Sequence, residues 1–537
     1  MLNSKVKQSS TLQKNALTIG FFSLISSFLG LLRDRFLASN FGASEALDIY
    51  YGSFKLPDLV FNILIFGIVS SAFVPIFSRQ LKKNPRKAKK LTGTALNLVL
   101  LSIISVSLVC ILLAPVLLKV IVPGFTGDKF ETTVNLTRIL FLSQILLSVS
   151  SIFSGVLATR RKFLIYSLAP IMYNLGIISG IYFFTPDFGV YGLGIAVVLG
   201  AFLHMLIQFP FALKNGFTFS KNFKLPEKIH KEIKRLFIPR GLSLIVNQLN
   251  ILFVTMIGST LIHGSLAVFN LANNLAQIPL TIFGAPFAIA AFTDLSFLYN
   301  KKDLKQFRKV FSNTLIKISF FVVPTTVIML SLRAQLVRLV LGAGKFDWQD
   351  TEITFQILGF LVLGLFFQST IPLVTRSFFA MQNTLIPFLC GFFSAIINLV
   401  LSISLADEMG IAGIALAFSI AQAVNLITML LVLYIKLDGF EDYKIYSVIL
   451  KIVISSLIMG TIIQLFKYFT ANSWDLIIES FKGYIQVNTL EAETFIKIFF
   501  QTGVSALLGV FVYLWVSWYI GIKEASVFIE KLKNLKK

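Results

Sequence analysis

Charged residues are scarce in this chain and make up only 14% of its 537 residues. Hydrophobic residues account for 56%, including 55 phenylalanines, and the mean hydropathy is +0.82. A soluble domain cannot cover that much apolar surface. The apolar runs are about 20 residues long, which is the length of a membrane-spanning helix rather than of a barrel strand. The composition therefore predicts an all-α polytopic membrane protein.

The sequence also lacks the motifs of enzymes and of ATP-driven pumps. It contains no GxxxxGKS or GxxxxGKT phosphate loop, no HExxH motif and no aspartate-rich motif of the kind that binds magnesium pyrophosphate. The two cysteines, Cys110 and Cys390, lie far apart in apolar runs, which argues against a disulfide framework or a metal site. We therefore expect no enzymatic activity, no cofactor and no bound metal.

Basic residues outnumber acidic ones by 48 to 25, which gives a net charge of +23. They gather in short loops between the apolar runs, as the positive-inside rule expects, so the charge does not indicate nucleic-acid binding. With fourteen spans, these loops fall on one side and place both termini in the cytoplasm. The first span is expected to be retained and not a cleaved signal peptide. The expected spans are 17–37, 57–78, 95–120, 136–157, 164–184, 189–212, 236–258, 266–292, 310–332, 353–375, 386–405, 411–435, 446–466 and 497–520.

Three short segments recur at an offset of about 220 residues. They pair 54–57 with 276–279, 72–84 with 291–303, and 189–196 with 410–417. The offset covers six spans, an even number, so the two copies would share one orientation, as in transporters built from parallel repeats. The expected domains are an N-lobe at 1–213 with spans 1–6, a basic cytoplasmic linker at 214–235, a C-lobe at 236–436 with spans 7–12, and a segment at 437–537 that holds two further spans, an outward loop at 467–496 and a basic cytoplasmic tail.

Charged and amide side chains lie within or beside the first two spans and the span at 266–292. A charge inside the membrane is costly unless it faces a partner or a water-filled cavity, so these side chains are candidates for a substrate path. Structural roles are open alternatives, since Asp48 can cap a helix, Lys55 can snorkel to the surface and asparagines can join helices. The candidate substrate-binding residues are Arg33, Asp34, Asp48, Lys55, Asn270, Asn273 and Asn274.

Several motifs are typical of one known family. Leu29-Gly30-x-x-Arg33-Asp34 is followed by Phe41-Gly42-Ala43 and Phe54-Lys55-Leu56-Pro57, and Gly344-Lys345-Phe346-Asp347 occurs in the second half. A loop motif occurs in both halves, with Arg160 in the first and Arg376, Gln382, Asn383 and Thr384 in the second. Together these residues resemble the MurJ/MviN family of lipid II flippases, in the multidrug/oligosaccharidyl-lipid/polysaccharide exporter superfamily.

The resemblance implies a function. Members carry lipid II, an undecaprenyl-pyrophosphate-linked glycan, from the cytoplasmic to the outer leaflet of the bacterial cytoplasmic membrane by alternating access, for peptidoglycan synthesis. The last two of fourteen helices would line a groove for the lipid tail. Arg33 and Lys55 would contact the pyrophosphate, Asp48 would pair with one of them, and the asparagines would bind sugar or peptide. Residues of the repeated loop motif would act as conformational loops, and a coupling cation stays unassigned.

The sequence departs from the family pattern at the cavity charges. Arginines of the family correspond here to Ser27, Phe61, Asn62 and Asn274, and a glutamate corresponds to Phe66. Three alternatives to lipid II transport follow from this loss: transport of another lipid-linked saccharide, export of a small molecule, or a scaffold that does not transport. A net-positive, wet cavity would favour a transporter, and a groove open to lipid would favour a lipid substrate.

Overall fold

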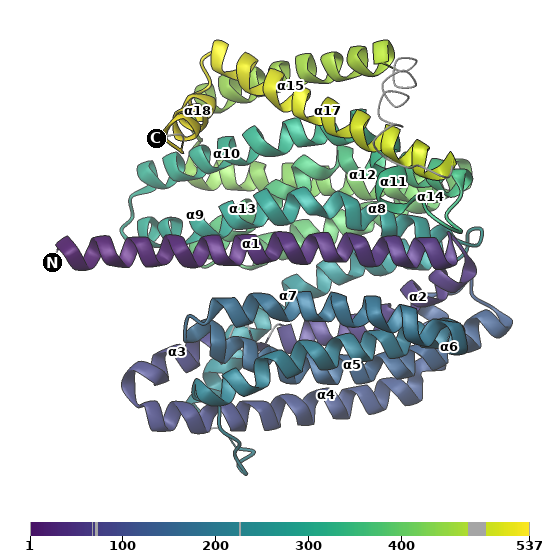
Figure 1. Cartoon of the computed structure of the whole chain (residues 1–537). Coiled ribbons are helices and arrows are strands. Elements are labelled where there is room, and N and C mark those ends of the chain that lie inside the picture. Colours follow the sequence, from purple (N-terminus) through teal and green to yellow (C-terminus); the bar gives the residue numbers. More distant parts are fainter. Residues whose placement is uncertain (1, 67, 70–72, 225–226, 471–489, 536–537) are drawn as a thin grey trace. The chain divides into compact units, whose positions relative to one another are not determined.

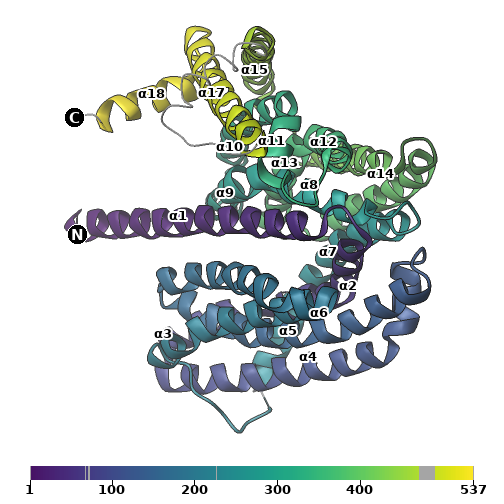
Figure 2. The same cartoon turned by 45° about the vertical axis from the view of Figure 1, so that its right-hand side comes forward.

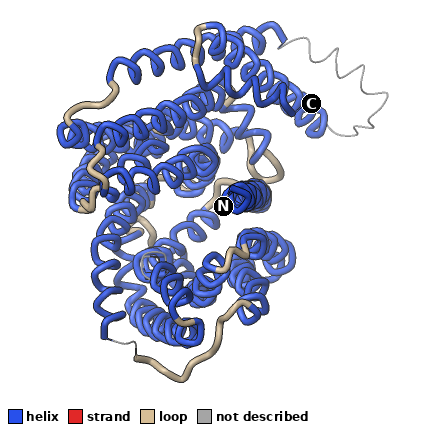
Figure 3. The backbone as a smooth tube through the Cα atoms, turned by 90° about the vertical axis from the view of Figure 1, so that its left-hand side faces the viewer, coloured by secondary structure: helices blue, strands red, loops and turns tan. Residues whose placement is uncertain are grey.

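The computed structural model describes residues 2–66, 68–69, 73–224, 227–470 and 490–535, and these contain helices joined by short connections, with no strand among them (Figures 1 and 3). Contacts divide the chain into two compact units, Met1–Asn270 and Leu271–Lys537. The expected lobe boundaries at 213 and 236 stay a prediction. Most of the outward loop expected at 467–496 lies outside the described residues.

The first unit is built around a core of buried phenylalanine and aliphatic side chains. Phe77, Phe141, Phe153 and Phe217 are among its fully buried members. Helix α5 packs against both α4 and α6, and α1 packs along α6. Its elements are α1 (Leu2–Phe41), α2 (Glu45–Phe61), the π-helix η1 (Asn62–Phe66), α3 (Val74–Lys83), α4 (Pro85–Ile121), α5 (Gly127–Thr159), α6 (Phe163–Lys214), α7 (Glu227–Gly258) and the start of α8 (Ser265–Pro279).

In the second unit, the two C-terminal spans pack on α10. The Tyr513 hydroxyl donates a hydrogen bond of 2.8 Å to the Phe320 carbonyl, which joins α17 to α10. A further buried cluster contains Ile452, Met459 and Ile463 of α15. The elements after α8 are η3 (Leu280–Gly284), α9 (Ala285–Asn300), α10 (Leu304–Ser331), α11 (Arg333–Leu341), α12 (Trp348–Leu363), α13 (Leu365–Ala380), α14 (Leu385–Leu437), α15 (Asp442–Thr470), α17 (Leu490–Tyr519) and α18 (Lys523–Leu535).

Each of the two longest helices contains two spans. With 52 residues, α6 would extend about 78 Å, far beyond the roughly 30 Å of a bilayer core. It reverses direction at Gly189, whose φ of 53° and ψ of −126° are not helical. After the reversal, a Cβ placed on Gly176 would lie 2.5 Å from the Gly200 Cα, so the two halves are antiparallel and in close contact. The same break occurs in α14 at Gly410, with φ 58° and ψ −140°.

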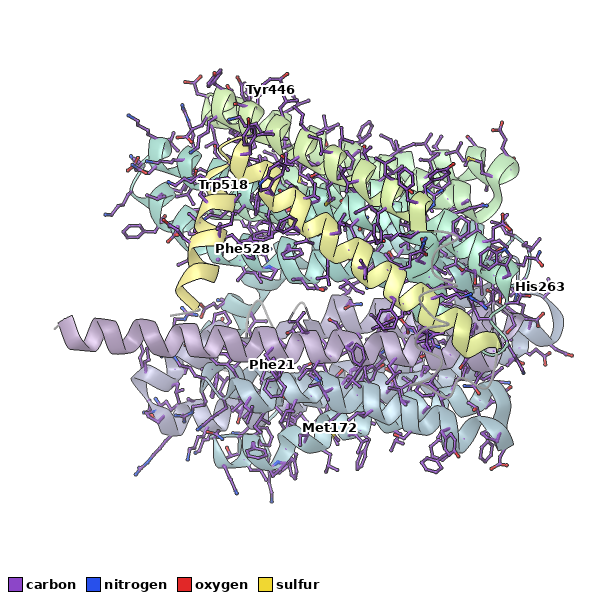
Figure 4. The ribbon with its side chains drawn as sticks, turned by 45° about the horizontal axis from the view of Figure 1, so that its top comes forward. Phe21, Met172, His263, Tyr446, Trp518 and Phe528 are labelled. Carbon is purple, nitrogen blue, oxygen red and sulfur yellow. The ribbon has the colours of Figure 1, made fainter. Side chains whose placement is uncertain are left out.

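In the part of the chain that the structure describes, each of the fourteen expected spans falls on helical segments. Within the described residues, nine helices are long and apolar enough to cross a membrane, and α6 and α14 are two of these. Large aromatic side chains on the outer helices are exposed, as expected for surfaces that face lipid, and Figure 4 shows Phe21, Tyr446, Trp518 and Phe528 among them.

The second span begins earlier than expected. The apolar pattern placed its start at 57, but α2 begins at Glu45 and contains Pro57 in its interior. The polar residues Asp48 and Lys55 lowered the apparent hydrophobicity of these first turns. The short helices α11 and α18 were not expected, because neither is long enough to span the membrane.

Local geometry repeats at the offset found in the sequence. Arg161 and Gln382, 221 positions apart, have φ values of 58° and 56° in corresponding helix-ending turns. The backbone N–H groups of Arg161 and Lys162 bond the Ala158 and Leu157 carbonyls, and those of Gln382 and Asn383 bond the Phe379 and Phe378 carbonyls. The π-helices η1 and η3 also occupy corresponding positions. These matches support an internal duplication.

The close contact inside α6 generates a stability prediction. A Cβ at Gly180 would lie 2.5 Å from both the Cα and the Cβ of Ala196, so Gly180→Val should force the hairpin apart and destabilise the protein by about 2 kcal/mol. Thermal unfolding in detergent should show a lower Tm. Gly503→Val is the matched control, because no atom lies within 4 Å of a Cβ at Gly503. Equal Tm values for the two variants would contradict the packing.

Candidate functional site

Arg33 is held between α1 and α6. Its Nε and Nη2 atoms lie 3.0 and 2.8 Å from one carboxylate oxygen of Asp34, and its Nη1 lies 3.3 Å from the Asn174 Oδ1. Asn174 in turn donates to the carbonyls of Ser26 and Pro170. The Asp34 side chain is 3% exposed, whereas that of Arg33 is 22% exposed. The guanidinium is therefore fixed in orientation, and the Arg33 side chain remains partly exposed.

Lys55 lies on α2 and bonds to α8. Its Nζ is 3.2 Å from the Asn270 Oδ1, and the Asn270 amide nitrogen donates to the Leu266 carbonyl. Within the described part of the chain, no carboxylate lies within 4.0 Å of this ammonium group. Asp58, almost one turn further along α2, accepts a bond of 2.9 Å from the Gln144 Nε2. Lys55 thus has a neutral hydrogen-bond partner.

Asp48 caps the beginning of α8. Its two carboxylate oxygens accept from the backbone N–H groups of Gly264 and Ala267 at 2.8 and 3.0 Å, and Oδ2 lies 3.1 Å from the Lys129 Nζ. A negative charge at a helix N-terminus satisfies unpaired N–H groups and favours the helix dipole. The expectation that Asp48 pairs with Arg33 or Lys55 is wrong, because Lys55 lies about 10 Å further along α2.

Around Asp48, further charged groups extend toward the surface. The Lys129 Nζ is 3.3 Å from the His263 Nδ1, which is 3.3 Å from the Glu45 Oε2. His263, labelled in Figure 4, lies at the end of the helices in the α7–α8 turn and is exposed. The N-terminal parts of α2 and α5 and the α7–α8 turn are therefore joined by one polar cluster.

The asparagines of α8 have different partners. Asn270 contacts Lys55, whereas the Asn273 Oδ1 lies 3.4 Å from the Gln277 Nε2, which is 3.3 Å from the Gln368 Oε1. Asn274 is half-buried on the same helix. The role of these three residues toward sugar or peptide stays a prediction.

The positions that differ from the family pattern lie near the same helices. Ser27 on α1, and Phe61 and Asn62 at the junction of α2 with η1, are half-buried, and the Phe66 side chain lies outside the described part. Without the family's arginines there, few cations remain among the charged residues described above. The cations are Arg33, Lys55 and Lys129, and the carboxylates are Asp34, Glu45, Asp48 and Asp58.

The loop residues hold helix ends. The Arg160 Nε donates to the Asn215 carbonyl at 3.0 Å, and the Asn383 Oδ1 accepts from the Ile386 N–H at 3.1 Å, which caps α14. Gln382 adopts the left-handed conformation noted above, Thr384 directly precedes α14, and Arg376 is half-buried on α13. Their predicted role in conformational change is untested.

Sequence reasoning missed three polar residues of the first unit. Lys129 lies outside the expected spans, directly after a loop, which hid its contact with Asp48. Gln144 is 2% exposed within an apolar helix. A buried amide requires a polar partner, so an amide inside an apolar run was the signal that the sequence offered. Asn174 is a buried amide within an apolar run, and it offered the same signal. Among the described residues, no cluster of histidine, cysteine and acidic side chains could hold a metal ion.

Comparison with known proteins places this geometry in context. A family model described as lipid II flippase MurJ matches residues 37–484. A probable lipid II flippase MurJ of Rickettsia prowazekii (strain Madrid E) is 29% identical over 427 residues, covering 78% of this chain and 82% of the relative. A probable lipid II flippase MurJ of Thermotoga maritima is 28% identical over 527 residues, covering 96% and 98%.

Solved structures agree on the fold. A lipid II flippase MurJ in an inward closed conformation matches with a TM-score of 0.74 at 24% identity, covering 96% of this chain and 99% of that one. An inward-facing MATE family transporter of the MOP superfamily matches with a TM-score of 0.65 at 16% identity, covering 77% and 94%. The prediction of an all-α polytopic membrane protein is confirmed. Since the family model spans most of the sequence, the chain belongs to the lipid II flippase MurJ family.

Proposed function

We propose that this protein carries lipid II from the cytoplasmic to the outer leaflet of the bacterial cytoplasmic membrane by alternating access. Its family consists of flippases, which move a lipid without converting it, so the chain is a transporter and not an enzyme. The observation that carries the proposal for this chain is Arg33, an oriented and accessible arginine that the family motif retains. Lipid II is the substrate named for the relatives.

Arg33 and Lys55 are the proposed pyrophosphate contacts. The guanidinium has more N–H donors than its bonds to Asp34 and Asn174 use, and the remaining donors suit a phosphate oxygen. Lys55 bonds the neutral Asn270 amide, which a pyrophosphate can replace without breaking an ion pair. Two cations are fewer than the family pattern supplies, so we expect Arg33 to be indispensable here.

Complementation tests the function. Expression of this chain should restore growth to a bacterium depleted of its own lipid II flippase, and Arg33→Ala should abolish the rescue because the oriented phosphate contact is lost. Lys55→Met should weaken it. Lys119→Met, at the exposed last turn of α4, is the matched control and should rescue fully. Absence of rescue despite normal membrane expression would refute the lipid II assignment, and rescue by Arg33→Ala would remove that residue's role.

Asp48 is a positioning residue in this proposal, because it bonds α8 and Lys129 and not the substrate. Asp48→Ala removes a helix cap and leaves the partly buried Lys129 ammonium without its carboxylate, so we expect a loss of about 2 kcal/mol in stability and a lower Tm. Glu45→Ala is the control. Its side chain is 45% exposed and its one ion pair among the described residues is with the exposed His263, so its Tm should match that of the parent. A matching Tm for Asp48→Ala would contradict the capping role.

Both termini are proposed to lie in the cytoplasm, which the basic loops support. Orientation in the membrane can be measured in a variant in which the free Cys110 and Cys390 are replaced by serine. Cysteines introduced one at a time then report the side of the membrane on which each position lies. A membrane-impermeant maleimide should label Asp128→Cys in intact cells, because the α4–α5 connection faces outward. Arg86→Cys, at the exposed start of α4, should be labelled only after lysis. The reverse pattern would invert the proposed orientation.

A further inference from the structure

A crevice of about 360 Å³ opens in the second unit among α10, α11, α12 and α14. Apolar side chains make up most of its wall, with Arg333 and Gln356 as polar members. Gln356 and Leu363 are exposed, so the crevice faces outward from the helices. Helices α11 and α12 lie beside each other along this wall (Figure 2). The apolar members used below are Leu330, Phe360, Leu363 and Met409.

Arg333 lies against α12 near one end of the α10 span. A Cβ placed on Gly359 would lie 3.3 Å from the Arg333 Nη1, so this glycine leaves room for the guanidinium. Arg333 is the first residue of α11 and lies just beyond α10, whose 28 residues extend about 42 Å. A bilayer core is about 30 Å thick, so Arg333 lies toward the membrane interface, where phospholipid headgroups lie.

A cation near the membrane interface can pair with an anionic lipid headgroup. The Arg333 Cζ lies 5.7 Å from the centre of the Phe355 ring, but no carboxylate of the described residues lies within 4.0 Å of the guanidinium. Its charged neighbour is a second cation, Lys467 of α15, whose Nζ bonds the Ser331 carbonyl at 2.9 Å. Arg333 therefore lines the crevice with Lys467 close to it, and neither cation has a carboxylate within 4.0 Å among the described residues.

We propose that this crevice binds a phospholipid with an anionic headgroup. The headgroup phosphate would pair with Arg333, with Lys467 adding positive potential, and an acyl chain would lie against Leu330, Phe360, Leu363 and Met409. The volume suits a phosphate with the first part of a chain and is too small for a glycan-peptide headgroup. None of the residues assigned to lipid II takes part.

Native mass spectrometry of the purified full chain with added phosphatidylglycerol tests the site. Arg333→Met keeps an unbranched aliphatic side chain but removes the charge. It should weaken phosphatidylglycerol binding about tenfold, as expected for the loss of one charged hydrogen bond. Arg333→Lys should retain most of the affinity. Arg338→Met, one turn further along α11 and outside the crevice, should bind like the parent. Unchanged binding by Arg333→Met would overturn the proposal.

Competition distinguishes the possible occupants. Unlabelled phosphatidylglycerol should displace bound, labelled phosphatidylglycerol at a lower concentration than inorganic phosphate or undecaprenyl phosphate does. Displacement by either at lower concentration would overturn the assignment, in favour of a free anion or of a prenyl-linked lipid. If Arg333→Met lowers the Tm, Leu363→Trp serves as the test instead. The larger indole should fill the apolar part of the crevice that would hold the acyl chain, and should therefore weaken binding. Normal binding by that variant would exclude the crevice.

Discussion

The need to neutralise charge inside the membrane is the constraint on which the rest of this structure depends. In the first unit, Arg33 bonds Asp34, Asp48 bonds Lys129, and Lys55 bonds the Asn270 amide. Each of these bonds except the first joins different helices, so the same contacts that make the charges tolerable also fix how α2, α5 and α8 meet. The geometry of the site and the packing of the unit therefore have one physical origin.

Glycine supplies the complementary constraint. The close approach of Gly176 to Gly200 and of Gly180 to Ala196 allows α6 to fold back on itself, and Gly410 allows the same reversal in α14. Without strong apolar driving force between helices in lipid, close packing at small residues becomes a principal source of their association. The glycines hold the hairpins together, while the buried charges determine which hairpins meet.

The sequence predicted the helices well, because long apolar runs report membrane spans directly. It also located the two reversals, since Gly189 begins the expected span 189–212 and Gly410 lies between the expected spans 386–405 and 411–435. It failed at α2, where polar residues in the first turns obscured a helix that begins at Glu45. It paired Asp48 with the wrong cation, because the contact with Lys129 joins residues 81 positions apart and no local pattern reports such a distance.

The distribution of paired and unpaired cations separates structural from binding roles. Lys129, 10% exposed and bonded to a carboxylate, is explained by the packing alone. Arg33 is bonded as tightly yet remains accessible, a combination that packing does not require. Lys55 and Arg333 have no carboxylate within 4.0 Å among the described residues, so each can take up a ligand phosphate without breaking an ion pair. A flippase with few cavity arginines must therefore rely on where its remaining cations lie and how they are oriented, more than on their number.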